Sequence, residues 1–150
     1  MAGLTQSTIG RKFLMALSAM FLLIFLVIHL SINLISVFSE EGFNAASEFM
    51  GSNPLIQFAM QPVLFAGVIF HFVMGFVLEL KNNAARPVKY AVAKNSGNST
   101  WMSRNMIISG AFILVYLAIH LADFWVPTIS KNYLGAVHTE SDFEHLQEKF

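Results

Sequence analysis

The chain has no cysteine and little charge. None of its 150 residues is cysteine, and Asp, Glu, Lys and Arg together make up only 12% of them. Without sulfur the chain can form no disulfide, no thiolate metal site and no cysteine-bound iron–sulfur cluster, so histidine and carboxylate remain as ligands for metal or redox chemistry. Nine basic residues balance nine acidic ones, which argues against a nucleic-acid-binding protein.

Apolar residues are abundant instead. They make up 55% of the chain, and the mean hydropathy is +0.60, whereas a soluble domain carries about 25% charged residues. Three apolar runs, at about 13–38, 54–80 and 106–126, are each long enough for the roughly 20 helical residues that cross a ~30 Å hydrocarbon core. The first run is too long for a secretory signal peptide, and no small-residue cleavage site follows it. We therefore expect residues 1–150 to form one all-α domain, a bundle of transmembrane helices surrounded by lipid.

The distribution of charge predicts the orientation of this bundle. Lys and Arg in short loops are retained on the cytoplasmic side of a membrane. Seven of the nine basic residues precede the first run or lie between the second and third: Arg11, Lys12, Lys81, Arg86, Lys89, Lys94 and Arg104. The loop between the first two runs contains Glu40, Glu41 and Glu48 and no basic residue. The N-terminus is therefore predicted to be cytoplasmic, and the C-terminal tail to lie on the outer side.

Two shorter elements are also predicted. The polar connector 82–105 has a turn-rich stretch, after which a helix restarts at Ser99 or Thr100 with Trp101 at the membrane interface. On the outer side, Ser141 and Glu144 are spaced as a capping box, which predicts a short amphipathic helix from about residue 142. The chain stops within this helix, which suggests an interruption rather than a natural end.

Each apolar run contains one histidine: His29, His71 or His120. An ionisable side chain inside a membrane is costly, so it marks a candidate functional site. Each histidine lies four residues past the centre of its run, a shift of roughly 6 Å. Because the first and third helices run outward and the second runs inward, His29 and His120 are predicted to share a level in the outer half, with His71 roughly 12 Å lower.

Two imidazoles at equal depth on separate helices can bind one metal from opposite sides, as in a bis-histidine haem held within a helix bundle. His71 would then serve a second centre without a partner from this chain. Gly67 and Gly75, one turn on either side of His71, either clear a helix face for a flat ligand or allow ordinary close helix packing. His138 and His145 follow the third run and are interpreted as surface residues.

The chain also resembles a known family. Its ordered motifs resemble the cytochrome b membrane subunit of succinate dehydrogenase and fumarate reductase, most closely the single-subunit, di-haem type of Bacteroidetes-like bacteria. The resemblance covers nearly the whole chain. The motifs that carry it are Ser7–Lys12, Phe25–Asn33, Phe49–Pro54, Phe70-His71, Ala85–Pro87 with Tyr90, Trp101–Arg104, Ile119–Leu121 and Phe124-Trp125.

The resemblance implies five spanning helices and four haem-ligating histidines, so that this chain would be an N-terminal fragment with three of the helices. His29 and His120 would ligate a distal haem b near the outer face. His71 would be one ligand of a proximal haem b, whose second ligand is absent from this chain. No residue here would be catalytic toward succinate, because that reaction of the tricarboxylic acid cycle belongs to the flavoprotein.

The resemblance also implies partners and further contacts. The chain would anchor a flavoprotein and an iron–sulfur subunit to the bacterial inner membrane and pass electrons between them and menaquinone or another quinone. Trp101, Ser103 and Arg104 are candidate contacts to haem propionates, with interface anchoring as the alternative. The basic residues Arg11, Lys12, Arg86 and Lys89 lie on the same side and could pair with propionates or with a partner subunit. The polar residues toward the outer side, where quinone chemistry occurs in the family, are Glu48, Gln57, Gln61 and Asp123.

Two other functions remain open from the residues alone. One is a transporter or proton channel whose histidines face water and carry protons. The other is a membrane scaffold without a cofactor. Few other polar residues lie along the three runs, which argues against a transporter, and the repeated histidine argues against a scaffold.

Overall fold

The described part of the chain is helical throughout. The computed structural model describes residues 7–85, 100–101, 105–135 and 141–149. Its elements are α1 (Thr8–Ile35), α2 (Glu40–Ser52), a π-helical segment η1 (Ile56–Met60), α3 (Gln61–Ala84), α5 (Met106–His120), a second π-helical segment η2 (Leu121–Trp125), α6 (Val126–Tyr133) and α7 (Asp142–Lys149). Three continuous helical runs, of 28, 29 and 28 residues, are long and apolar enough to cross a membrane. The predicted all-α transmembrane bundle is confirmed.

The ends of the spanning helices differ from the predicted bounds. α1 begins five residues before residue 13 because Ser7 caps it, with Oγ accepting a hydrogen bond of 2.9 Å from the backbone N–H of Gly10. The third span continues beyond residue 126 to Tyr133, because the helix passes Pro127 directly after the π-helical segment η2 instead of ending there. Trp101 is helical, as expected for a restart near Thr100.

The connection between the first two spans contains a helix that sequence reasoning treated as a loop. α2 begins after Ser39, whose Oγ accepts a 3.0 Å hydrogen bond from the N–H of Gly42. Glu40 and Glu41 occupy its first turn, where negative charge is favoured by the helix dipole. The predicted helix from residue 142 is confirmed as α7. Its capping box is formed in both directions, by Glu144 N–H to Ser141 Oγ at 3.1 Å and by Ser141 N–H to Glu144 Oε2 at 2.8 Å.

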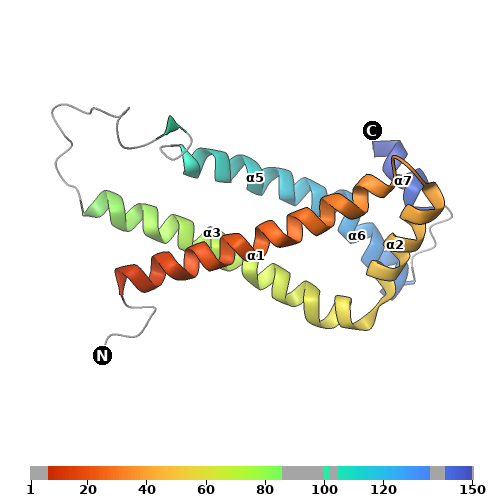
Figure 1. The fold of residues 1–150 in the computed structure, drawn as a ribbon, viewed down its shortest axis with the longest axis horizontal. Coiled ribbons are helices and arrows are strands. Elements are labelled where there is room, and N and C mark those ends of the chain that lie inside the picture. The colour runs from red at the N-terminus through yellow and green to blue at the C-terminus, as the bar shows by residue number, and fades with distance from the viewer. Residues whose placement is uncertain (1–6, 86–99, 102–104, 136–140, 150) are drawn as a thin grey trace.

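α1 and α3 cross near their middles (Figure 1). A Cβ atom placed on Gly67 would lie 2.9 Å from Cε1 of Phe21, so only glycine allows the two helices to approach this closely. A Cβ on Gly75 would lie 3.5 Å from the terminal methyl of Met15. Both glycines therefore face α1, and close helix packing is the interpretation that the structure supports. The face of α3 on which Gly67 and Gly75 lie is occupied by α1, so it is not open to a flat ligand.

Among the described residues, the bundle has almost no apolar core. Phe43 of α2, at 7% exposed, is the one large hydrophobic side chain there that is buried, whereas Leu23 of α1 and Ile113 of α5 are 62% and 59% exposed. Long aliphatic surfaces of this kind fit hydrocarbon rather than water. In the described ranges the helical spans are thus held to one another at a few places. These are the α1–α3 crossing, a contact of α3 with α5, a ring contact of α1 with α5, and the end of the bundle where α2, α6 and α7 pack, called the outer end after its predicted orientation.

Each π-helical segment begins six residues before a proline, η1 before Pro62 and η2 before Pro127. A proline removes one N–H donor and crowds the carbonyl four residues earlier, and a π-turn relieves that crowding. Asp123 lies four residues before Pro127, and Nε2 of His145 is 2.8 Å from its carbonyl oxygen. α7 therefore supplies the donor that Pro127 lacks.

Helices α2, α6 and α7 pack together at the outer end of the bundle (Figure 1). The amide of Asn132 donates to the carbonyl of Gly51 at 2.9 Å, and a Cβ on Gly51 would lie 2.9 Å from that same amide nitrogen. Asp142 accepts hydrogen bonds from Ser47 at 2.5 Å and from Lys131 at 3.2 Å. These contacts fasten the short helices over one end of the spanning segments.

Candidate functional site

His29 of α1 and His120 at the end of α5 lie against each other. Their ring centroids are 5.7 Å apart and their planes meet at 86°. The predicted common level of these two histidines is confirmed. α1 and α5 are otherwise well separated along the bundle (Figure 1), so the histidine pair is a principal contact between these two helices.

Each imidazole of the pair is stacked on an aromatic ring one turn earlier in its own helix. Phe25 lies 5.4 Å from His29 at an interplanar angle of 18°, and Tyr116 lies 5.8 Å from His120 at 16°. The segments Phe25–Leu30 and Tyr116–Leu121 both have an aromatic residue followed by Leu, a small apolar residue, Ile, His and Leu. The two similar sequences thus have the same local structure. Phe124 adds a third ring, 5.1 Å from His120 on the other side. The pair is therefore held among aromatic side chains.

Asn33 is the polar neighbour of the pair. Its amide nitrogen donates to the carbonyl of His29 at 2.8 Å and lies 3.4 Å from Nε2 of the same residue. The second distance is at the long end for a hydrogen bond, and the first is a good one. The amide is therefore engaged mainly with the backbone, which leaves the ring nitrogen available.

His71 lies at a different level, on α3. Its Nδ1 atom is 2.9 Å from Oγ of Ser18 on α1, and this Oγ also donates to the carbonyl of Met15 at 2.8 Å. Ser18 precedes His29 by eleven residues of the same helix, which corresponds to roughly 16 Å along the axis. The structure thus separates His71 from the outer pair, in the direction that the depth argument predicts.

The outer pair fits a haem better than a metal ion bound by protein alone. A metal held by one nitrogen of each ring at about 2 Å would place the ring centroids about 6 Å apart, close to the observed 5.7 Å. No three His, Asp or Glu side chains in the described ranges form a group that could hold a metal ion. A porphyrin brings four nitrogen ligands of its own, so a haem iron would need only two ligands from the protein, and His29 and His120 could supply them.

The N-terminal end of α1, which is predicted to lie on the inner side, carries an arginine with one unpartnered nitrogen. Nε of Arg11 is buried and has no hydrogen-bond partner in the described part of the chain. Arg11 precedes Ser18 by seven residues, so it lies on the same face of α1, roughly 10 Å further inward. A guanidinium nitrogen without an acceptor suits an anionic group such as a propionate.

Of the other predicted propionate contacts, only Trp101 lies in the described ranges, and it is not brought to a histidine. Trp101 is 70% exposed, and no hydrogen bond or ring contact joins it to His29, His71 or His120 in the described ranges. Ser103 and Arg104 lie outside the described residues, as do Arg86 and Lys89. Their predicted roles stay predictions.

His145, which was interpreted as a surface residue, is instead packed against the spanning helices. Its ring lies 5.9 Å from Phe124, in addition to its contact with the carbonyl of Asp123. The carboxylate of Asp123 pairs with Lys149 of α7 at 3.4 Å. Rings thus follow one another from His120 through Phe124 to His145 at the outer surface. His138 lies outside the described residues.

The outer glutamines form structural hydrogen bonds. Gln57 is 6% exposed, and its amide donates at 2.9 Å to the carbonyl of Met50, four residues before Pro54. Oε1 of Gln61 accepts from the indole N–H of Trp125 at 3.2 Å. Both side chains thus link the outer ends of helices, which accounts for polar residues at this depth.

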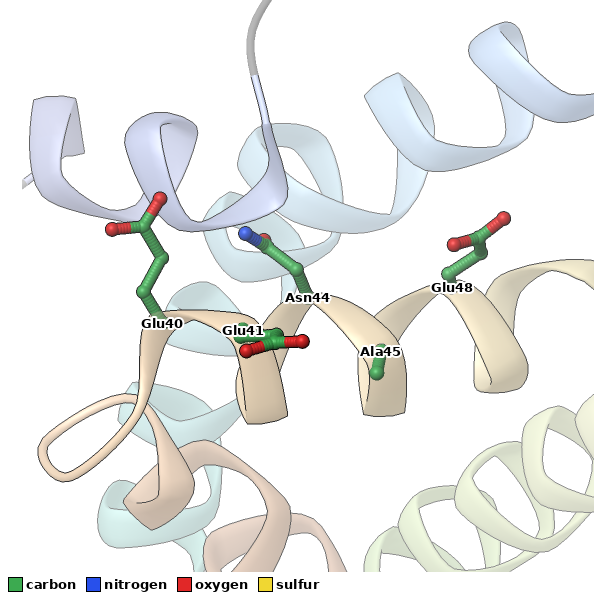
Figure 2. A pocket seen from close by; sticks show the side chains of 5 residues that line it. All are labelled: Glu40, Glu41, Asn44, Ala45 and Glu48. Carbon is green, nitrogen blue, oxygen red and sulfur yellow. The ribbon is translucent and has the colours of Figure 1, made fainter.

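An open acidic groove of about 540 Å³ runs along α2. Figure 2 shows Glu40, Asn44 and Glu48 on successive turns of this helix, with Glu41 and Ala45 beside them. Glu48 therefore lies in a group of exposed carboxylates at the outer end, and no hydrogen bond or ring contact in the described ranges joins it to His29, His71 or His120.

Comparison of the chain with protein-family models, curated proteins and solved structures finds no match.

Proposed function

We propose that the chain is the haem b-containing membrane anchor of a succinate:quinone oxidoreductase, that is, of a succinate dehydrogenase or fumarate reductase complex. The observation that carries this proposal is the pairing of His29 with His120 between two spanning helices, with ring centroids 5.7 Å apart. Two imidazoles lying against each other in an apolar, aromatic setting are the arrangement that a bis-histidine haem requires.

The chain's own residues would bind and orient the cofactor. His29 and His120 would occupy both axial positions, and the rings of Phe25 and Tyr116, stacked on them, would fix their orientation. A haem held in this way supplies one-electron redox chemistry, and because both axial positions are filled it is suited to electron transfer rather than oxygen binding. The apolar helix surfaces around the pair would exclude water.

His71 would ligate a second, proximal haem together with a residue outside this chain. Its level is roughly 16 Å from the outer pair along α1, on the side where Arg11 lies. Electrons would pass between an iron–sulfur subunit on the inner side, the two haems and menaquinone or another quinone, while a flavoprotein carries the succinate or fumarate reaction. The concentration of Lys and Arg on one side supports an N-terminus on the cytoplasmic side of a bacterial inner membrane.

The reduced-minus-oxidised visible spectrum of the membrane-expressed chain, supplied with haem, tests the proposal. We expect a sharp low-spin b-type band that is abolished by His120→Ala. His145→Ala is the matched control, because this residue lies at the same outer end but on α7, and it should keep the band. Absence of the band in the unaltered chain would refute the haem function and favour the transporter or scaffold.

A further inference from the structure

Ser18 is an unusual residue in its place in the bundle. It is a polar side chain only 9% exposed, in the middle of an apolar spanning helix, and its Oγ lies 2.9 Å from Nδ1 of His71 on the neighbouring helix. Serine and histidine side chains that hydrogen-bond across spanning helices are a known source of helix association. The bond between Ser18 and His71 therefore holds α1 to α3.

A count of protons determines the direction of the bond. The hydroxyl of Ser18 has one hydrogen, and the carbonyl of Met15, at 2.8 Å, accepts it. Oγ must therefore act as the acceptor toward His71, so Nδ1 carries the hydrogen and donates it. In a neutral imidazole the other nitrogen, Nε2, then has no hydrogen and presents a lone pair.

The helix crossing keeps Ser18 in this position. Met15, Ser18 and Phe21 follow at three-residue intervals on one face of α1, and Gly67 and Gly75 lie one turn on either side of His71. Met15 covers Gly75 and Phe21 covers Gly67, so the serine is placed opposite the histidine by the contacts on both sides of it. Close packing of this kind leaves the hydroxyl little freedom to turn elsewhere.

We infer that Ser18 is a positioning residue that fixes His71 in the Nδ1–H tautomer and so makes Nε2 the iron ligand. This inference rests on the proposed haem function. Metal-ligating histidines usually donate their second ring N–H to an acceptor that sets tautomer and orientation, and the Ser18 hydroxyl is such an acceptor. At the outer pair no side-chain oxygen in the described ranges contacts either ring nitrogen, so this device belongs to the His71 level.

The tautomer can be measured without haem, by long-range ¹H–¹⁵N NMR of the 150-residue chain labelled on histidine in lipid nanodiscs. We expect His71 as the Nδ1–H form, a mixture that includes the Nε2–H form in Ser18→Ala, and the original form again in Ser18→Thr, which keeps the hydroxyl. Ser31→Ala is the matched control, because Ser31 lies on the same helix and donates only to the carbonyl of Val27. A His71 tautomer that is the same with and without the Ser18 hydroxyl would overturn the inference.

Haem binding at His71 is measured separately, in a background in which His29 and His120 are both replaced by alanine, with added imidazole as the second ligand. Ser18→Ala should weaken haem binding roughly 10- to 100-fold, the usual effect of losing such a partner, and Ser18→Thr should restore it. If haem binds equally tightly in Ser18→Ala, the positioning role fails and the haem function stands. If the tautomer depends on Ser18 but no haem binds in any variant, the proposed function fails and Nε2 loses its assigned role.

Discussion

The two histidine levels of the bundle are built in different ways. At the outer level, His29 and His120 face each other and each is stacked on an aromatic ring of its own helix. At the inner level, His71 faces a serine hydroxyl of the opposite helix. A histidine is costly in a membrane at both levels. At the outer level its neighbour is a second imidazole, and at the inner level its neighbour is a hydrogen-bond acceptor.

The difference concerns rigidity as well as chemistry. The inner level lies in the α1–α3 crossing, where Gly67 brings the helices into close contact. The outer level depends on stacking within each helix, and α1 and α5 meet there without a close glycine contact. The outer rings are thus supported mainly by contacts within their own helices, whereas the inner histidine is held by a contact between two helices.

The largest expected effect comes from removing one histidine at each level. His29→Ala should abolish the low-spin haem signal of the chain, because one axial ligand is lost. His71→Ala should leave that signal intact, because the outer pair does not involve α3. The measurement is haem content per chain together with the reduced-minus-oxidised spectrum. Equal loss of the low-spin signal in both variants would mean that the two histidine levels form a single site rather than two.

Gly67→Val should disturb the inner level selectively. Its Cβ would overlap the ring of Phe21, and overpacking of this kind costs about 1–3 kcal/mol. Unfolding in detergent micelles should therefore become easier, while the haem signal of the outer pair persists. Gly110→Ala is the control, since a Cβ there would have its nearest neighbour 4.0 Å away, in Phe72. If Gly67→Val lost the outer haem while its unfolding stayed unchanged, the outer level rather than the inner one would depend on the close α1–α3 contact.

Tyr116→Leu should weaken the outer level moderately. The substitution removes the ring stacked on His120, and aromatic pairs of this kind contribute about 0.5–1.5 kcal/mol beyond their burial. Haem affinity, measured by titration, should fall by about two- to tenfold, and Phe25→Leu should act similarly through His29. Tyr116→Phe keeps the ring and should behave as the unaltered chain. An unchanged haem affinity in Tyr116→Leu would show that ring stacking does not support the outer site.

Lys149→Ala should have the smallest effect. The ion pair of Lys149 with Asp123 is exposed on both sides, at 37% and 39%, and such pairs contribute about 0–1 kcal/mol and are screened by salt. Haem affinity should stay within about twofold of the unaltered chain at moderate salt. A large loss would show that α7 supports the outer histidines more strongly than its packing indicates.

The spans and the depth of the histidines could be predicted because they depend on simple regularities. Apolar run length locates the helices, and a constant rise per residue converts sequence distance into depth. These two quantities alone were sufficient to bring His29 and His120 to one level. They do not depend on which side chains pack together.

The features that were missed depend on packing or on local capping. The start of α2 is marked in the sequence by an N-cap residue, Ser39, followed by two acidic residues, Glu40 and Glu41. The segment is too short and too polar to be found by a search for membrane-spanning runs. Ser18 could not be singled out, because a serine in an apolar helix shows no partner until a second helix is placed beside it. His145 was misjudged because its partner is a backbone carbonyl, that of Asp123, which Pro127 leaves without its usual donor.

The central claim is that His29 and His120 together bind one haem between α1 and α5. Electron paramagnetic resonance of the oxidised chain, purified in lipid nanodiscs and titrated with haem in a His71→Ala background, tests it most directly. The account predicts a low-spin ferric signal that saturates at one haem per chain and disappears when either His29 or His120 is also replaced by alanine. A high-spin signal, or a low-spin signal that survives loss of one of these two histidines, would contradict it.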